Sequence, residues 1–133
     1  MKTRIKEYIG EILPELLKIS DEIFDLAELS CQEFKSCRIL EEYLEKNGFT
    51  VEQGVGGMET SFRAVYQQGE GGPSFGLLAE YDALSMGHGC GHHMQGPVIL
   101  GAAMCIKKLC GDRPCKIVVY GTPAEESLGG KII

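Results

Sequence analysis

Residues 74–79 have the sequence Ser-Phe-Gly-Leu-Leu-Ala, and residues 116–120 have the sequence Lys-Ile-Val-Val-Tyr. Both are short, nearly continuous apolar runs, which are typical of strands buried on both faces of a sheet. Between them, residues 98–109 carry a helical pattern rich in Ala, Ile and Leu. This spacing predicts a βαβ unit with a right-handed crossover. The carboxyl ends of its two parallel strands then open onto one crevice, where ligands of open α/β sheets usually bind.

The chain before this unit predicts two helices. Residues 5–26 place Ile and Leu at alternating spacings of three and four, as in an amphipathic helix. Pro14 lies inside this stripe, so we expect either a kink there or a helix start near Leu13. Residues 32–46 predict a second helix, ended by Asn-Gly. Its inward side chains are expected to be Phe34, Cys37, Leu40 and Leu44.

The period of the apolar pattern changes to two after the second helix. Residues 49–52 and 60–66 predict strands, separated by the glycine-rich segment 54–57. Residues 127–133 resemble the beginning of a further helix. Together the patterns predict one folding unit of class α/β, with an open, mixed, largely parallel sheet and flanking helices.

Composition narrows the classes of partner. The 133 residues are 44% hydrophobic and 24% charged, as in a folded protein, and the net charge is −6. This acidic balance disfavours nucleic acid and anionic membranes as partners. No apolar run reaches the length of a membrane span or of a signal peptide, so we expect a cytoplasmic protein. Six cysteines in such a chain are expected to be free thiols, with metal binding as the exception.

Acidic side chains follow the first buried run. Glu80 and Asp82 are two positions apart, so in extended chain both carboxylates face the same side. They form either a carboxylate pair facing the crevice or a polar strand end exposed to water.

Residues 87–93, Gly-His-Gly-Cys-Gly-His-His, carry the strongest chemical signal. Imidazole and thiolate suit zinc and its transition-metal neighbours, and the glycines let the backbone turn closely around an ion. In extended chain His88, Cys90 and His92 would share a side. Alternatives are a backbone anion site, an incidental thiol, or a Cys90 nucleophile activated by a histidine. Metal binding is favoured because a catalytic thiolate pair does not need three imidazoles.

Residues 121–126, Gly-Thr-Pro-Ala-Glu-Glu, follow the second buried run. Thr122 and Glu125 match a capping box, and Pro123 suits the first position of a helix, so this segment alone predicts a helix start. Its place at the same sheet edge as the Cys/His loop favours another interpretation. A metal hydrolase needs one carboxylate on the ion and another that takes a proton, and Glu125 and Glu126 would divide these roles.

The three motifs together, with Gly129-Gly130-Lys131, resemble consecutive motifs of the aminoacylase/carboxypeptidase metallopeptidase family. The likeness is to its amidohydrolase branch, which includes N-acyl-amino-acid and aminobenzoyl-glutamate hydrolases and dipeptidases. Residues 26–36 and 43–49 also look like the opening helices of that branch. The resemblance implies a catalytic α/β domain with two divalent metal ions (Zn, Mn or Co), interrupted by a lid domain that mediates homodimerisation.

The resemblance also implies roles for particular residues. Cys90, His92 and Glu126 match metal ligands, and Glu125 matches the catalytic glutamate. Asp82 matches an acid in a supporting position beside the metals. Two positions have no assigned role, namely His88, which matches a motif position, and His93, which stands where the branch has Asp or Asn.

We therefore expect residues 1–133 to be the N-terminal part of a catalytic domain that lacks two further histidine ligands, the lid and the rest of the domain. The whole protein would hydrolyse the amide of an N-acyl or N-aroyl amino acid or a dipeptide, through a water activated by metal. The 133 residues alone are expected to have little activity. The alternatives are a non-catalytic metal- or thiol-binding module and a cysteine hydrolase that uses Cys90.

Overall fold

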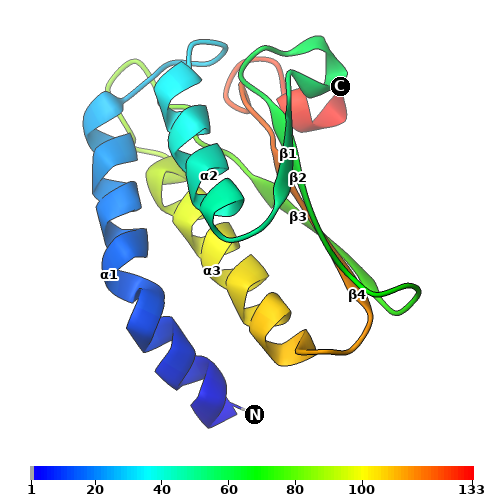
Figure 1. The fold of residues 1–133 in the computed structure, drawn as a ribbon. Coiled ribbons are helices and arrows are strands. Elements are labelled where there is room, and N and C mark those ends of the chain that lie inside the picture. The colour runs from blue at the N-terminus through cyan, green and yellow to red at the C-terminus, as the bar shows by residue number, and fades with distance from the viewer. Residues whose placement is uncertain (1) are drawn as a thin grey trace.

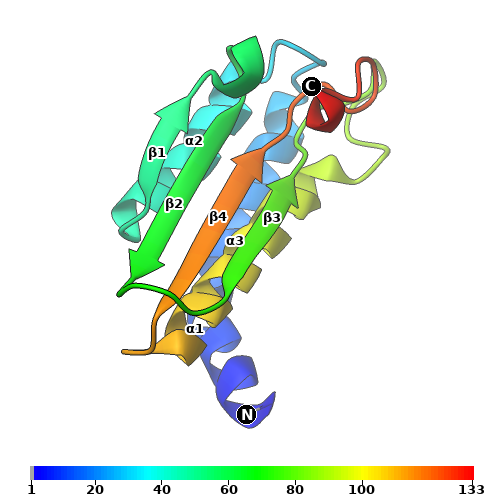
Figure 2. The same ribbon diagram turned by 90° about the vertical axis from the view of Figure 1, so that its right-hand side faces the viewer.

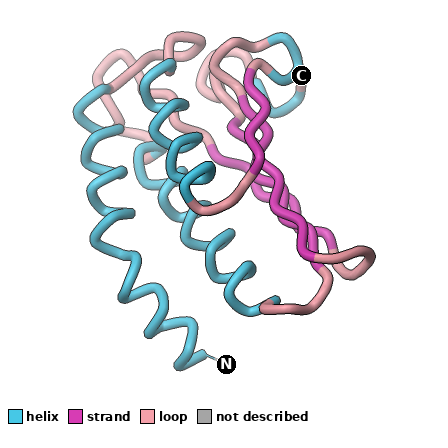
Figure 3. Tube along the Cα trace, in the orientation of Figure 1, coloured by secondary structure: helices cyan, strands magenta, loops and turns pink. Residues whose placement is uncertain are grey.

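The computed structural model describes residues 2–133 as three helices, four strands and two 3₁₀ turns (Figures 1 and 3). The elements in chain order are α1 (Lys2–Leu26), α2 (Phe34–Lys46), β1 (Thr50–Gln53), η1 (Val55–Gly57), β2 (Phe62–Gln68), β3 (Ser74–Ala79), α3 (His92–Cys110), β4 (Cys115–Gly121) and η2 (Gly130–Ile132). None of the helices within residues 2–133 combines the length and the apolar character that crossing a bilayer requires.

The four strands form one sheet in the order β1-β2-β4-β3, and the three α-helices lie on one side of it (Figures 1 and 2). The strands β1 and β2, and β2 and β4, pair antiparallel, whereas β3 and β4 pair parallel. The mixed α/β fold with flanking helices is confirmed, but the expectation of a largely parallel sheet is wrong, because two of the three pairings are antiparallel. The β3-α3-β4 unit places the ends of both parallel strands together, because Ala79 pairs with Gly121.

The core fills the space between the helices and the sheet. It is built by the inward face of each helix and by the covered face of β2 and β4. Its largest fully buried apolar side chains are Ile23, Leu40, Leu44, Phe62, Tyr81, Leu100, Met104, Ile117 and Val119. Burial of these side chains holds the helices against the sheet that carries the site.

The strand β3 is more exposed than its sequence predicts. Both apolar runs predict strands buried on both faces, and β4 fits this description better because it lies between two strands. In β3, by contrast, Phe75 is 36% exposed and Leu78 is 49% exposed. The expectation is wrong for β3 because this strand lies at the sheet edge and the helices cover only one face (Figure 2).

Helix α1 runs through Pro14, so a helix start near Leu13 is wrong. A proline leaves the carbonyl four residues earlier, at Gly10, without its helical partner. Both Pro14 and Gly10 are exposed. The freed carbonyl is therefore on the exposed side of the helix, and the apolar stripe of α1 continues on the opposite side.

Helix α2 begins at Phe34, two residues later than expected. Cys37, Leu40 and Leu44 are buried as predicted, but Phe34 is 53% exposed, so its inward placement is wrong. The residue just before it, Glu33, is fully buried instead. At this end of the helix, the carboxylate of Glu33 is therefore buried in place of the expected Phe34 ring.

Helix α3 begins at His92, six residues before the predicted start at residue 98. Gly96 and Pro97 lie within α3 and are both buried. A Cβ atom on Gly96 would lie 2.8 Å from Cδ2 of Leu40, so glycine permits the close approach of α3 to α2. The longer helix brings His92 to the end of the sheet.

Candidate metal centre

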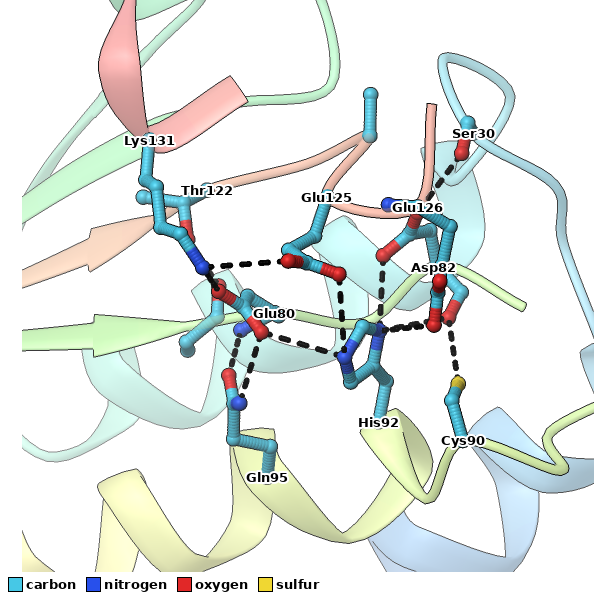
Figure 4. A network of polar contacts seen from close by, with 12 residues as sticks. Ser30, Glu80, Asp82, Cys90, His92, Gln95, Thr122, Glu125, Glu126 and Lys131 are labelled. Atoms are coloured by element: carbon cyan, nitrogen blue, oxygen red, sulfur yellow. Dashed lines mark hydrogen bonds and ion pairs between the residues drawn. The ribbon is translucent and has the colours of Figure 1, made fainter. Parts of the chain in front are cut away.

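The predicted site residues gather where β3 and β4 end (Figure 4). Residues 80–82 continue from β3, residues 125–126 follow β4, and residues 90–92 lead into α3. The left-handed backbone of Gly91, with φ of 87°, turns the chain between the loop and the helix. Three segments distant in sequence therefore present polar side chains to one another.

The imidazole of His92 lies between two pairs of carboxylates. Its Nδ1 atom is 3.0 Å from Oδ1 of Asp82 and 4.0 Å from Oε1 of Glu126. Its Nε2 atom is 3.2 Å from Oε2 of Glu80 and 3.8 Å from Oε2 of Glu125. The side chain of His92 is 11% exposed, so the imidazole itself is largely shielded from water.

The carboxylate of Asp82 fixes these segments to one another. Its Oδ2 atom accepts hydrogen bonds from the Ser30 hydroxyl at 2.7 Å and from the Glu126 amide at 3.0 Å. Burial alone would raise the pKa of Asp82, but these two hydrogen bonds and the contact with His92 outweigh it and lower the pKa. Asp82 is thus held ionised at the centre of the site.

One set of donor atoms comes from Cys90, His92 and Glu126, which we call the cysteine set. One ligand atom from each of the three lies within 4.8 Å of the other two. The Sγ atom of Cys90 is 3.8 Å from the main-chain oxygen of Asp82. Thiolate, imidazole and carboxylate together fit zinc and neighbouring divalent metals. The residues present therefore fit the metal that the sequence implies.

The thiol of Cys90 does not have the character of an activated nucleophile. Partial desolvation of the sulfur, with the nearby Glu126 carboxylate, raises the pKa of Cys90. A catalytic thiolate needs a lowered pKa and a histidine that takes its proton. In this structure the ring nitrogens of His92 contact carboxylates. The geometry favours a metal ligand over a cysteine hydrolase.

A second set, Glu80, His92 and Glu125, is called the glutamate set, and its donor atoms also lie within 4.8 Å of one another. A lysine is already bound to it, because Nζ of Lys131 is 2.6 Å from Oε1 of Glu80 and 3.4 Å from Oε1 of Glu125. The pKa of Lys131 is raised, first by its hydrogen bond to Glu80. Burial would raise the pKa of Glu80, but hydrogen bonds from Lys131 and Gln95 outweigh it and lower the pKa.

Glu33 is a site-supporting residue to which the sequence assigned no role. It is fully buried, and its Oε1 atom accepts a hydrogen bond of 2.8 Å from the amide of Ala124. Its Oε2 atom accepts a hydrogen bond of 2.9 Å from the hydroxyl of Thr60. Ala124 has a positive φ of 56°, which is strained for a residue with a side chain. Glu33 therefore holds the turn that presents Glu125.

His88 and His93 lie away from the donor sets, so the expectation that His88, Cys90 and His92 share a side is wrong. Their rings pack against each other with centroids 5.3 Å apart, and Phe24 of α1 lies beside both. The loop is not extended, because Gly87 and Gly91 both have positive φ. Burial lowers the pKa of His88, and the electrostatic influence of the neighbouring His93 lowers it further.

The segment after β4 is not capped as a helix, so that interpretation of Thr122 and Glu125 is wrong. Residues 125–128 form a turn, and only η2 follows. The hydroxyl of Thr122 donates to the carbonyl of Ala79 at 3.1 Å instead of capping. Glu125 and Glu126 are therefore free of helix-capping roles and point toward His92 (Figure 4).

An open α/β sheet with thiol, imidazole and carboxylate donors at the ends of parallel strands is the arrangement expected of a metal-dependent hydrolase. Comparison with known proteins gives the same class. The chain is 35% identical over 133 residues to a p-aminobenzoyl-glutamate hydrolase polypeptide of Escherichia coli, covering 85% of this chain and 27% of the relative. It is 34% identical over 149 residues to human Xaa-Arg dipeptidase, covering 99% of this chain and 34% of the relative.

Among solved structures, the fold matches a dinuclear metal-binding peptidase of the M20 family from Bacillus subtilis. The TM-score is 0.73 at 22% identity, over 88% of this chain and 36% of that structure. No family model matches the sequence. The homologues of this chain are amidohydrolases and peptidases, and its structural neighbours include dinuclear M20 peptidases, as the motif resemblance predicted. The chain spans about a third of the length of these relatives.

Proposed function

We propose that residues 1–133 are the N-terminal part of the catalytic domain of a metal-dependent amidohydrolase. Its substrate would be an N-acyl or N-aroyl amino acid or a dipeptide. The observation that carries the proposal is the convergence of Cys90, His92 and Glu126, whose donor atoms lie within 4.8 Å of one another. The names of the relatives, an aminobenzoyl-glutamate hydrolase and a dipeptidase, support this class of substrate.

In this proposal the cysteine set holds a divalent ion, which is Zn, Mn or Co. A bound ion supplies Lewis acidity that polarises a carbonyl and lowers the pKa of water. Asp82 keeps the His92 ring beside Cys90 and Glu126, because its buried carboxylate contacts Nδ1 at 3.0 Å. The whole protein would bind a second ion. Sequence outside these 133 residues would supply two further histidine ligands, the lid and the remaining part of the catalytic domain.

Glu125 is the proposed proton carrier. Its side chain is 31% exposed, so it is open to water and to substrate, and its Oε2 atom lies 3.8 Å from Nε2 of His92. It would accept a proton from the attacking water and then donate it to the leaving amine. Because water is the nucleophile, no covalent acyl-enzyme forms.

Hydrolysis of N-acyl amino acids and dipeptides, assayed in the protein at its full natural length, tests this function. A chelator should abolish turnover, and added Zn, Mn or Co should restore it. Glu125→Gln should remove most turnover and leave metal content unchanged, whereas the exposed Glu70→Gln should behave as wild type. Turnover that resists the chelator and survives the change at Glu125 contradicts the proposal.

We further propose a cytoplasmic homodimer that uses a small-molecule substrate and binds neither nucleic acid nor membranes. All six cysteines are unpaired in the structure, which supports a reducing compartment. The net charge of −6 supports the exclusion of polyanionic partners. Size-exclusion chromatography with light scattering on the full-length protein tests the dimer, and a monomeric mass contradicts it.

A further inference from the structure

The ammonium group of Lys131 contacts both acids of the glutamate set. Its Nζ atom is 2.6 Å from Oε1 of Glu80 and 3.4 Å from Oε1 of Glu125. Within residues 2–133, the other ion pairs formed by lysine or arginine lie outside this set. Lys131 is therefore the cation that neutralises these two acids.

The Glu80 carboxylate that binds this lysine is held in place by Gln95. The amide nitrogen of the Gln95 side chain donates to Oε2 of Glu80 at 3.0 Å, and its oxygen accepts a hydrogen bond from the Glu80 main-chain amide. The side chain of Glu80 is 10% exposed. Lys131, which belongs to the short η2 turn, is therefore bound to a carboxylate that is itself held in place by Gln95 (Figure 4).

Glu125, by contrast, has few contacts of its own. The hydrogen bond from Lys131 is the one side-chain hydrogen bond of its carboxylate within residues 2–133. The next polar atom is Nε2 of His92 at 3.8 Å. The direction of the Glu125 carboxylate thus depends on the ammonium group.

The two donor sets share His92 but differ in their cation. The cysteine set has no lysine or arginine among its ion pairs in the described part of the chain, whereas the glutamate set already holds Lys131. A divalent ion that entered the glutamate set would have to displace the ammonium group or lie against its positive charge. Charge repulsion by Lys131 would therefore favour an ion at Cys90 and Glu126 over one in the glutamate set.

We propose that Lys131 is a positioning residue that reserves Glu125 for proton transfer by occupying the cation position between Glu80 and Glu125. The role of Glu125 rests on the proposed function, but the exclusion of metal by Lys131 does not. A role for Lys131 in binding a substrate carboxylate is disfavoured, because two carboxylates already neutralise its single charge.

Cobalt titration of the 133-residue chain tests this proposal, because absorption by a thiolate–cobalt bond reports Cys90 separately from total binding. Wild type should bind about one ion with thiolate absorption. Lys131→Met should bind a further ion without added thiolate absorption, with affinity raised by about tenfold or more over any second event in wild type. Lys131→Gln should bind the further ion as well. This second neutral variant shows that the effect comes from the lost charge and not from the methionine side chain.

Three controls make the result specific to the ammonium group. Lys131→Arg keeps the charge and should bind cobalt as wild type does. Lys18→Met removes an ammonium from an exposed ion pair with Glu22 and should change nothing. The double variant Glu80→Gln/Lys131→Met should lose the further ion, because the glutamate set loses a carboxylate.

Equal stoichiometry and affinity in wild type and in both neutral Lys131 variants would overturn the proposal. A further ion that persists when Glu80 is changed would also overturn it, because binding would then lie elsewhere. Failure of the metal centre gives a different result, since Cys90→Ala would then leave the first binding event and its affinity unchanged.

Discussion

The Nδ1 atom of His92 lies 3.0 Å from the Oδ1 atom of Asp82, and the Asp82 side chain is completely buried. A buried carboxylate that contacts one ring nitrogen fixes the orientation of the imidazole. The same carboxylate accepts the Glu126 amide, so it also sets the place of a second proposed ligand. Asp82 therefore couples two of the three residues of the cysteine set without belonging to it.

Asp82→Asn should weaken metal binding by about 10–100-fold, the usual cost of losing such a supporting carboxylate. The asparagine side chain keeps the size but not the charge that accepts hydrogen bonds from Ser30 and Glu126. Competition with a chromophoric chelator measures the affinity. Asp21→Asn, on the exposed face of α1, is the matched control. Equal affinities of the two variants would mean that Asp82 does not organise the site.

Asp82 should also make the fold sensitive to acid. Because its pKa is lower in the folded protein than its ordinary value of 3.8, the ionised form stabilises the fold above that value. This stabilisation is lost as the pH falls from 3.8 through the lower native pKa. The free energy of unfolding of wild type should therefore fall more steeply in this range than that of Asp82→Asn. Urea unfolding at a series of pH values measures the difference, and parallel curves would contradict the expectation.

Glu33→Gln should destabilise the fold by about 1–3 kcal/mol, because one buried hydrogen-bond donor loses its acceptor. Glu33 accepts hydrogen bonds from Thr60 and Ala124 with its two oxygens, and a glutamine amide would turn one NH₂ group toward a donor. Urea unfolding measures the change. Glu59→Gln, an exposed neighbour of Thr60, should leave stability within about 0.5 kcal/mol. A Glu33 variant as stable as this control would show that the buried contacts are dispensable.

The sequence predicts the location of the site better than its internal contacts. Consecutive apolar runs and a helix between them require that Ala79 and Gly121 meet, and this alone brings Glu80 and Glu126 to one edge. The geometry follows from strand direction, which a local pattern reveals. The same logic places His92 at the edge, although α3 begins six residues before the start predicted at residue 98.

Contacts that bridge distant segments were not predictable. Lys131 reaches Glu80 across 51 positions, and Glu33 reaches Ala124 across 91 positions. Helical or strand periodicity reports only neighbours within a few residues, so it carries no information about such pairs. The exposure of β3 was missed for the same reason, because the sequence of a strand does not say what lies beside it.

Cys90→Ser should remove the thiolate absorption of bound cobalt and lower affinity by about tenfold or more, because a serine hydroxyl stays protonated and binds such ions poorly. A pair of cysteines provides the control for thiolate binding outside the cysteine set. Cys110 lies beside Cys115 at the other end of α3, where a stray ion would also meet sulfur. Cys110→Ser should leave both absorption and affinity as in wild type. If instead Cys110→Ser removes the absorption and Cys90→Ser does not, the ion is bound at the far end of α3 and the cysteine set is not a metal centre.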